Sequence, residues 1–382
     1  MLLLAHLILF QRSLILSREA GLFQSCPWTG SLTSLIHSKH LIKLVYYIFV
    51  QKNILVFTNG EKIGDGIIKL PLLSEIKRRL PDRQLIWMTN KGSTVYNNQL
   101  KNIAGQFIDE IIEQADLNPF FWQRISNKYN FSKKKFEYIF DTQKAVLRTI
   151  ALKRIKCSYF ISSAASGFFS TKKIKKKSIH ISRQYYLEDL FNLLDIIKED
   201  VDVVDRNFRI TIPTDLKFQL IKIFDKNISY IGLSPGAGEK NKIWPIDNFI
   251  KVGKFFENKS YKIVLFLGPN ENFIKEKLKS IFPKALLPEE QINDFSGYEV
   301  VIGSTNFLSC ALANDSGTGH MLSTNYCPLI KLFGHKDSDK FTRSANNITA
   351  ISAKEFGSTD ISAISTDCVI KKIEDVIKTS TK

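Results

Sequence analysis

The stretch Asn314-Asp315-Ser316-Gly317-Thr318-Gly319-His320 decides the fold, because it joins an apolar run to a helical run through small residues. Cys310–Ala313 precede it as in a buried strand, and the helix-compatible Met321-Leu322-Ser323 follow it. A second strand-like run, Pro328–Phe333, comes soon after. A strand, a turn and a helix N-terminus in that order direct unpaired backbone N–H groups at one point, where the helix dipole adds about half a positive charge. The stretch therefore predicts an anion site, and phosphate is the usual occupant of such a site.

Strand-like and helical runs alternate along the rest of the chain. The expected strands are Ile54–Phe57, Gln84–Met88, Tyr138–Phe140, Tyr159–Ile161, Tyr230–Leu233 and Ile263–Leu267. The expected helices are Ile68–Leu80, Gln143–Arg154, Asp247–Phe256, Phe273–Ile281 and Val369–Ile377, the last with Asp367 as its cap. This alternation predicts an α/β fold in which helices cover both faces of parallel sheets.

The alternation loosens between Ser170 and Lys226, which predicts a crossing between two domains. We expect one domain over residues 51–215, a second over residues 216–382, and a cleft between them. Residues 1–50 form an N-terminal extension whose apolar runs are shorter than the ~20 residues that span a bilayer. Three interpretations of the extension are open: a segment that contacts a membrane interface, an extra helical layer, or a start codon placed too far upstream.

The net charge of +17 is the outlier of the composition. It indicates an anionic partner, which is a nucleic acid, an acidic membrane or a phosphorylated substrate, unless the general richness in Lys supplies it. The basic run Lys172–Lys177 has the same two explanations: contact with an anionic membrane, worth about 1 kcal/mol per charge, or a solvated loop. The 5 cysteines and 6 histidines are scattered, so their spacing favours neither a disulfide framework nor a metal site.

Two polar positions follow expected strands of the first domain. Gly64-Asp65-Gly66 lies in the loop after the first strand, at the carboxyl edge where α/β sheets bind ligands. The glycines let the backbone approach a substrate, and Asp65 either projects into the cleft or caps a helix that begins near Ile67. Asp141 ends another strand at this edge, where it either lines an acceptor site or caps the next helix. The spacing of Gly60, Gly64 and Gly66 does not fit the dinucleotide fingerprint, which disfavours an NAD site.

The second domain opens with a similar turn. Ser234-Pro235-Gly236-Ala237-Gly238 follows a strand directly, and its small residues admit a phosphate or a sugar against the backbone. Lys242-Ile243-Trp244-Pro245 comes next. Lys242 either neutralises a diphosphate leaving group or is one more solvated lysine, while Trp244 packs. His320 either donates to a phosphate or caps its helix.

The order of these motifs resembles that of the ADP-heptose:lipopolysaccharide heptosyltransferases of glycosyltransferase family nine. The resemblance runs from Asn53 to the final helix. It rests on Ile63-Gly64-Asp65 with Pro71, Pro235-Gly236-Ala237, Lys242-Ile243-Trp244-Pro245, Asn314-Asp315-Ser316-Gly317 with His320, and Leu332-Phe333-Gly334. The chain departs from the family pattern at His335-Lys336-Asp337-Ser338 and at Gly268-Pro269-Asn270-Glu271, and the first fifty residues have no counterpart.

The resemblance implies a GT-B architecture, in which an acceptor-side domain (51–215) and a donor-binding domain (216–382) face each other across the cleft. It implies inverting, metal-independent transfer of a heptose from a nucleotide-diphosphate sugar, without a further cofactor, to an anionic lipid-linked glycan of the lipopolysaccharide core. By this resemblance Asp65 is the catalytic base, Lys242 contacts the donor phosphates, and Asp315 through His320 form the donor-binding loop. The implied place of work is the cytoplasmic face of the inner membrane, with peripheral contact to that membrane.

The chemistry agrees with these roles. An unperturbed Asp has a pKa of about 3.9, far below that of a sugar hydroxyl, so Asp65 must accept the proton as the new bond forms. Lys242 and the N–H groups after Asp315 stabilise the charge on the departing diphosphate. Two other functions are kept as alternatives. A basic nucleic-acid-binding protein would bind with a steep salt dependence, but the sequence shows no nucleic-acid motif. The second alternative is a glycan-binding relative without turnover.

Overall fold

The computed structural model describes residues 53–120, 129, 131, 134–171, 193–194, 210–268, 271–335 and 347–380. The interpretations of residues 1–50 and of the basic run Lys172–Lys177 therefore lie outside the described residues, as do Pro269, Asn270 and Lys336–Ser338.

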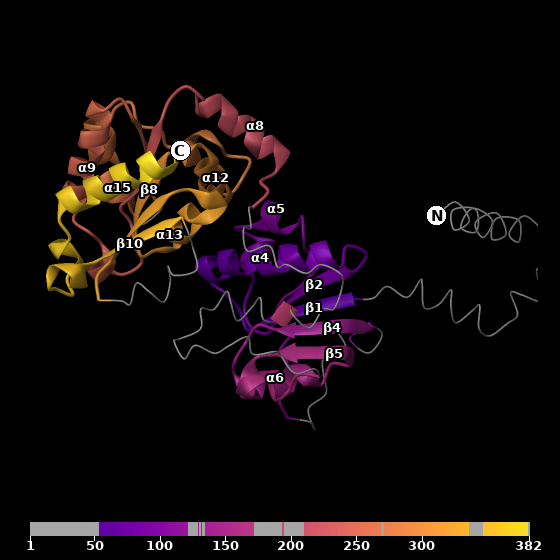
Figure 1. Ribbon diagram of the computed structural model, residues 1–382. Coiled ribbons are helices and arrows are strands. Elements are labelled where there is room, and N and C mark those ends of the chain that lie inside the picture. Colours follow the sequence, from indigo (N-terminus) through magenta and orange to yellow (C-terminus); the bar gives the residue numbers. More distant parts are fainter. Residues whose placement is uncertain are drawn as a thin grey trace, which may run out of the picture. The chain divides into compact units, whose positions relative to one another are not determined.

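The first half of the described chain is a five-stranded sheet of parallel strands in the order β3-β2-β1-β4-β5 (Figure 1). Its strands are β1 (Asn53–Thr58), β2 (Gln84–Thr89), β3 (Glu110–Ile112), β4 (Phe136–Asp141) and β5 (Cys157–Ser162). Its helices are α4 (Ile63–Arg79), α5 (Lys101–Ala104) and α6 (Val146–Lys153), with short 3-10 turns η1 (Val95–Asn97) and η3 (Ala164–Gly167). The four strands expected here are confirmed, and β3 is an addition of three residues.

Alternate residues of β1 pack on opposite faces of this sheet, as side chains in a strand must. Ile54 and Val56 belong to the apolar cluster that includes the buried side of α4. Leu55 and Phe57 belong to the cluster that includes Ala151 and Leu152 of α6. Because both faces are covered, β1 is apolar throughout its length, and this run identified the strand in the sequence.

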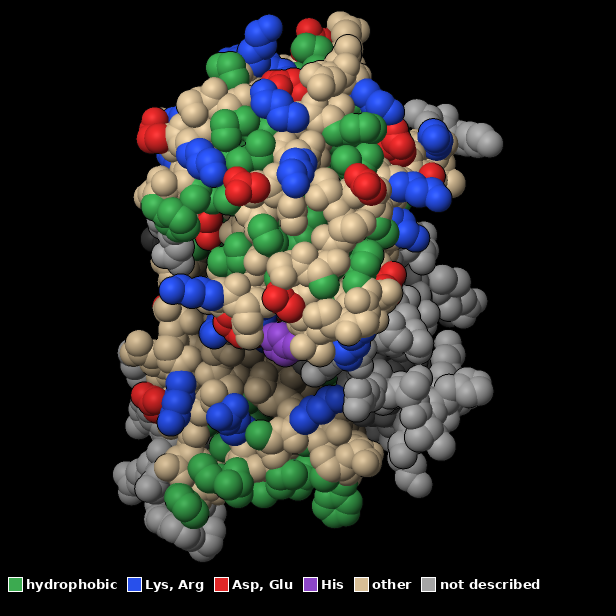
Figure 2. Space-filling view, turned by 90° about the vertical axis from the view of Figure 1, so that its left-hand side faces the viewer, with side chains coloured by type: hydrophobic (Ala, Val, Ile, Leu, Met, Phe, Trp, Pro, Cys, Tyr) green, Lys and Arg blue, Asp and Glu red, His purple; other side chains and the backbone are tan. Residues whose placement is uncertain are grey.

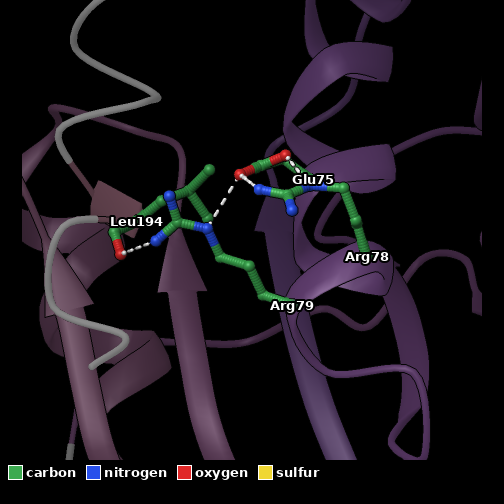
Figure 3. Close-up of polar contacts among 4 residues, drawn as sticks. All are labelled: Glu75, Arg78, Arg79 and Leu194. Atoms are coloured by element: carbon green, nitrogen blue, oxygen red, sulfur yellow. Dashed lines mark hydrogen bonds and ion pairs between the residues drawn. The ribbon is translucent and has the colours of Figure 1, made fainter. Parts of the chain in front are cut away.

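Helix α4 begins earlier than expected, at Ile63 instead of near Ile67. It contains Pro71 in its interior and ends at Arg79, two residues before Pro81. Its last turn carries an ion-pair group that reaches another segment of the chain (Figure 3). Glu75 accepts hydrogen bonds from Arg78 Nη2 at 2.6 Å and Arg79 Nε at 2.8 Å, and Arg79 Nη1 donates to the carbonyl of Leu194 at 3.2 Å.

The second half holds another parallel five-stranded sheet, in the order β10-β9-β8-β6-β7. Its strands are β6 (Tyr230–Ser234), β7 (Lys262–Leu265), β8 (Cys310–Asn314), β9 (Leu329–Phe333) and β10 (Ile348–Ser352). Its helices are α8 (Thr214–Ile223), α9 (Ile246–Asn258), α10 (Asn272–Ile281), α11 (Pro288–Gln291), α12 (Gly297–Ser304), α13 (Gly317–Leu322) and α15 (Thr366–Ser380). Its 3-10 turns are η4 (Lys240–Lys242), η6 (Thr305–Phe307), η7 (Thr324–Tyr326), η8 (Ala353–Phe356) and η9 (Ile361–Ala363).

Helices again cover both faces of this sheet. Buried residues of α9, α10 and α15 pack with one set of strand residues, and buried residues of α12 and α13 pack with the alternate set. The C-terminal helix is confirmed, but Asp367 is not its cap. Asp367 lies inside the first turn, and Ser365 Oγ accepts the hydrogen bond from Cys368 N at 3.1 Å.

Specific contacts join the first half of the described chain to the second half. Glu299, at the start of α12, is 1% exposed and accepts from the backbone N–H groups of Asn102 at 2.7 Å and Ile103 at 3.1 Å. It thereby satisfies the first turn of the short helix α5. Helices α4 and α13 also pack against each other. Among the described residues, no helix has the length and apolarity needed to cross a bilayer.

Candidate functional site

Asp65 lies in the first turn of α4, not in the loop before that helix as expected. The helix starts after Lys62, so the interpretation of Asp65 as its cap is wrong. Its side chain is exposed, and its negative charge suits the positive end of the helix dipole. Since β1 ends at Thr58, Asp65 is held near the carboxyl edge of the first sheet on a rigid element.

The two glycines beside Asp65 serve different contacts. A Cβ atom at Gly64 would lie 3.1 Å from His320 Cδ2, so the bare backbone of Gly64 allows the His320 ring to approach. A Cβ atom at Gly66 would lie 2.4 Å from Val95 Cγ2, which means that Gly66 is required by packing inside its own half. The contact of Gly64 with His320 brings the Asp65 turn against the stretch that follows β8.

A buried polar group lies behind Asp65, and the sequence did not reveal it. Lys69, one turn further along α4, is 2% exposed and donates to Thr58 Oγ1 at 3.0 Å. Burial lowers the pKa of Lys69, although the carboxylates of Glu61 and Asp65 oppose that shift. Burial raises the pKa of Glu61, against hydrogen bonds from Thr94 and the charge of Lys69. Lys69 is thus a buried amine one turn from Asp65 on the same helix, held by the hydroxyl of Thr58.

Asn314 links the predicted motifs of the second half. Its side chain is fully buried; Oδ1 accepts from Trp244 N at 3.2 Å, and Nδ2 donates to the carbonyl of Pro235 at 2.8 Å. Trp244 is itself buried, and its indole N–H donates to the carbonyl of Ile364 at 3.1 Å. The end of β8 thus fixes both the Ser234–Gly238 turn and the segment that carries Lys242.

Replacing Asn314 by Ala tests this link. The change leaves the Trp244 N–H and the Pro235 carbonyl without partners. Each buried polar group that loses its hydrogen bond lowers the free energy of unfolding by about 1–3 kcal/mol. We expect the urea midpoint of unfolding to fall clearly. Asn227→Ala, at an exposed position in the loop before β6, should leave the midpoint unchanged. Equal midpoints for Asn314→Ala and wild type would contradict the linking role.

Ser234 and Gly236 shape the first turn of the second half. Ser234 is 1% exposed, and its hydroxyl has no hydrogen-bond partner within the described part of the chain. A Cβ atom at Gly236 would lie 2.3 Å from Glu271 Oε1, so this glycine makes room for the Glu271 carboxylate. Burial raises the pKa of Glu271, against hydrogen bonds from backbone N–H groups.

Asp315 lies between two lysines. Lys331 Nζ is 3.0 Å and Lys242 Nζ 3.9 Å from its carboxylate oxygens. Burial alone would raise the pKa of Asp315, but Lys331, His320 and Lys242 outweigh burial and lower it. The Lys242 side chain is only 13% exposed and also pairs with Glu239 at 2.7 Å, so the interpretation of Lys242 as a solvated lysine is wrong.

Lys331 was not anticipated, because it lies in the apolar run that predicted β9. Its side chain is 1% exposed. The available signal was a single lysine inside a run that otherwise reads as a buried strand, since a buried ammonium group needs an anionic partner. The charges of Lys331 and Lys242 are balanced at this edge of the second sheet by Asp315 and by Glu239, which pairs with Lys242.

Helix α13 starts at Gly317, and its first turn holds the predicted anion-binding N–H groups. Ser316 is its cap, because Ser316 Oγ accepts from Gly319 N at 3.0 Å, so the interpretation of His320 as the cap is wrong. A Cβ atom at Gly319 would lie 2.8 Å from the carbonyl oxygen of Asn314, which explains the glycine there. The helix has only 6 residues. A short helix sums few peptide dipoles, so the dipole of α13 contributes less to an anion site than the sequence suggested.

Asp141 is fully buried at the end of β4. It accepts hydrogen bonds from Thr149 Oγ1 at 2.6 Å, Ser162 Oγ at 2.8 Å and Gln143 N at 2.9 Å. Burial raises its pKa, and these three bonds oppose the shift. It is not the cap of α6, which starts after Ala145. We leave Asp141 out of the proposed site, since its carboxylate is enclosed by its own domain.

Metal ligands are not gathered in the part of the chain that the structure describes: no three His, Cys, Asp or Glu side chains there lie close enough to hold an ion.

Comparison with known proteins gives one family match. The model of glycosyltransferase family 9 (heptosyltransferase) matches residues 132–367, which is more than half of the chain. A search of curated proteins gives no match.

Solved structures of this family have the same fold. A family 9 glycosyltransferase from Veillonella parvula aligns with a TM-score of 0.60 and 18% identity, over 86% of this chain and 97% of that one. ADP-heptose lipopolysaccharide heptosyltransferase II of E. coli aligns with a TM-score of 0.59 and 11% identity, over 87% of this chain and 100% of that one. E. coli heptosyltransferase WaaC with ADP aligns with a TM-score of 0.57 and 15% identity, over 85% of this chain and 99% of that one. WaaC is also solved with ADP-2-deoxy-2-fluoro heptose. The two parallel sheets with helices on both faces thus form a GT-B architecture of two Rossmann-like domains, and the chain belongs to glycosyltransferase family 9, the heptosyltransferase family.

Proposed function

We propose that this glycosyltransferase moves a heptose from ADP-heptose to an anionic, lipid-linked glycan of the lipopolysaccharide-core type, with inversion and without a metal. The observation that carries the proposal is the position of Asp65. Its turn contacts His320 through Gly64, and His320 belongs to the same short stretch as Asp315, which the buried Lys331 and the partly buried Lys242 flank. A candidate base and a candidate diphosphate site therefore adjoin each other.

Asp65 acts on the acceptor in this proposal. Its exposed carboxylate accepts the proton of the acceptor hydroxyl as that oxygen attacks the anomeric carbon of the donor. A single displacement needs one base and inverts the anomeric centre. The family match begins at residue 132, beyond Asp65, so the role of Asp65 is supported by its position and by the motif resemblance.

The leaving nucleoside diphosphate is the part that the second half stabilises. Lys242, Lys331 and the first-turn N–H groups of α13 present positive charge where negative charge grows during bond breaking. Fixed cations and dipoles can do this without a metal. ADP is proposed as the leaving group because the solved relative WaaC binds ADP and an ADP-heptose analogue.

The domain roles follow from these positions. We assign residues 51–215 to the acceptor and residues 216–382 to the donor, and we place the enzyme at the cytoplasmic face of the inner membrane, where a lipid-linked acceptor would be met. The family match does not favour the nucleic-acid alternative. A glycan-binding relative without turnover remains the alternative that the transfer assay decides.

A panel of sugar nucleotides tests the proposal. We expect ADP-heptose to raise the melting temperature of the protein more than UDP- or GDP-sugars, because a ligand that binds only the folded state stabilises it by mass action. The stabilising donor should then yield free nucleoside diphosphate and a lengthened glycan when a core acceptor is added, also in the presence of EDTA. Stabilisation without any transfer would support the binding relative, and no stabilisation by any sugar nucleotide would contradict the proposal.

Replacing Lys242 by Gln tests the diphosphate contact. Losing a charge-assisted hydrogen bond of about 1.5–3 kcal/mol should weaken donor binding by roughly 10–150-fold. The matched control is Lys240→Gln, since Lys240 is exposed in the same turn. Calorimetric titration with ADP measures both variants. Wild-type affinity in Lys242→Gln would leave that lysine only a structural partner of Glu239 and Asp315.

A further inference from the structure

Large apolar side chains are exposed where the chain leaves two neighbouring strands of the first sheet. Val146 and Leu147, at the start of α6, are 41% and 67% exposed, and Phe168, directly after η3, is 81% exposed. Helix α6 follows the carboxyl end of β4, and η3 follows that of the adjacent β5. The three side chains therefore extend from the same edge of the sheet as the Asp65 turn, which follows β1 beside β4.

The backbone before Phe168 is held in an unusual conformation. Ala165, Ser166 and Gly167 have φ values of 47°, 56° and 83°. Residues other than glycine adopt this region at a cost, and such strain gathers at functional segments. Phe168 also stacks edge-on against Phe169, which Lys153 of α6 contacts at 5.7 Å from the ring centre. The turn thus presents Phe168 to solvent from a fixed support beside α6.

The segment that carries these side chains is basic. The sequence has no Asp or Glu between Asp141 and Glu188. Lys144, Arg148, Lys153 and Lys156 are exposed around α6. Figure 2 shows hydrophobic side chains along the lower edge of the molecule, with Lys and Arg side chains and an acidic side chain above them. The basic run Lys172–Lys177 follows Phe168 closely in the sequence.

We propose that this α6–η3 surface, made by Val146, Leu147, Phe168 and the four cations around α6, docks on an anionic lipid bilayer. Apolar side chains that enter the interface together with cations that meet anionic headgroups are the features of interfacial membrane binding. A nucleic acid would match the cations but would leave Leu147 and Phe168 in water. Docking in this way places the sheet edge that carries Asp65 next to the bilayer. The inference rests on the proposed function in one respect: a lipid-linked acceptor would explain why Asp65 should lie there.

Vesicle partitioning of the full chain tests the apolar part. Vesicles of phosphatidylcholine mixed with phosphatidylglycerol are sedimented with wild type and with Leu147→Ser/Phe168→Ser. We expect partitioning to fall at least about tenfold, since each side chain loses apolar area that the bilayer would bury. The matched control is Phe218→Ser/Phe273→Ser, at positions 61% and 82% exposed in the second half, which should partition like wild type.

A charge series tests the electrostatic part. Each Lys or Arg near an anionic surface contributes about fivefold in partitioning, so Lys144→Gln/Arg148→Gln/Lys156→Gln should lose roughly a hundredfold on anionic vesicles and little on phosphatidylcholine alone. Lys222→Gln/Lys226→Gln/Lys251→Gln, at exposed positions of the second half, is the control. The proposal would be overturned if either α6–η3 variant partitioned like wild type, or if the control variants lost as much partitioning. It would also be overturned if the wild-type protein bound duplex DNA but not vesicles.

Thermal stabilisation by ADP-heptose is measured on the same variants, and it should equal that of wild type. If ADP-heptose does not stabilise the wild-type protein although the protein binds vesicles, only the proposed function is contradicted. If ADP-heptose stabilises the wild-type protein but the protein does not bind vesicles, only the docking surface is contradicted.

Discussion

Asp65→Asn should lower the transfer rate by about 10²–10⁴-fold, which is the usual contribution of a general base, and should leave ADP binding unchanged. The substitution keeps the size of the side chain and removes its capacity to take a proton. Because Asp65 is exposed and adjoins the donor stretch without belonging to it, binding and turnover should separate. Steady-state transfer and calorimetric titration with ADP measure the two effects.

Stability provides the control for this variant. Asp65 interacts with the dipole of α4, so its neutralisation should cost no more than about 1 kcal/mol. Asp82→Asn, at an exposed position just beyond the end of α4, should transfer at the wild-type rate. Normal turnover in Asp65→Asn would remove the base assignment, and lost ADP binding would show that Asp65 acts on the donor.

Lys331→Met should destabilise the protein by about 3–5 kcal/mol, the cost of removing one partner from a buried ion pair. Lys331 and Asp315 are 1% and 9% exposed, so solvent cannot replace the lost ammonium group. Lys242 remains, but at 3.9 Å and shared with Glu239. Urea unfolding measures the loss, and Lys262→Met, on a half-buried lysine that begins β7, is the control with a much smaller expected effect.

The pH dependence of this loss follows from Asp315. Its pKa in the folded protein is lower than the ordinary value of 3.8. The stability that it contributes is therefore fully present above that value and is lost as the pH falls through the folded pKa. The difference between wild type and Lys331→Met should be largest at neutral pH and should shrink below about pH 4. A difference that stays constant down to that pH would contradict the ion-pair account.

Most of the fold could be predicted because its strands are buried on both faces. Runs such as Ile54–Phe57 and Cys310–Ala313 are apolar throughout and stand out from the polar segments around them. Strand β3 was missed because it has 3 residues, with Glu110 at its start. Helix α12 was missed because it is buried nearly all round, so its sequence lacks the polar stripe that marks a helix.

The site was predictable where small residues and strand ends coincide. The stretch after β8 could be identified from its small residues and its place between two strands, although its helix is capped by Ser316 and not by His320. The linking role of Asn314 and the pairing of Lys331 with Asp315 depend on which strands are neighbours, since β8 lies between β6 and β9. Sequence spacing does not contain that order. The glycines around Asp65 were assigned to substrate approach, but Gly66 is required by packing against Val95.

Calorimetric titration of the wild-type protein with ADP and with AMP tests the central claim most directly. The claim is that Lys242, the Asp315–Lys331 pair and the first turn of α13 bind a nucleoside diphosphate. ADP should bind at least tenfold more tightly than AMP, because the second phosphate gains charge-assisted hydrogen bonds of about 1.5–3 kcal/mol. Equal affinities for ADP and AMP, or no binding of ADP at millimolar concentration, would contradict the account.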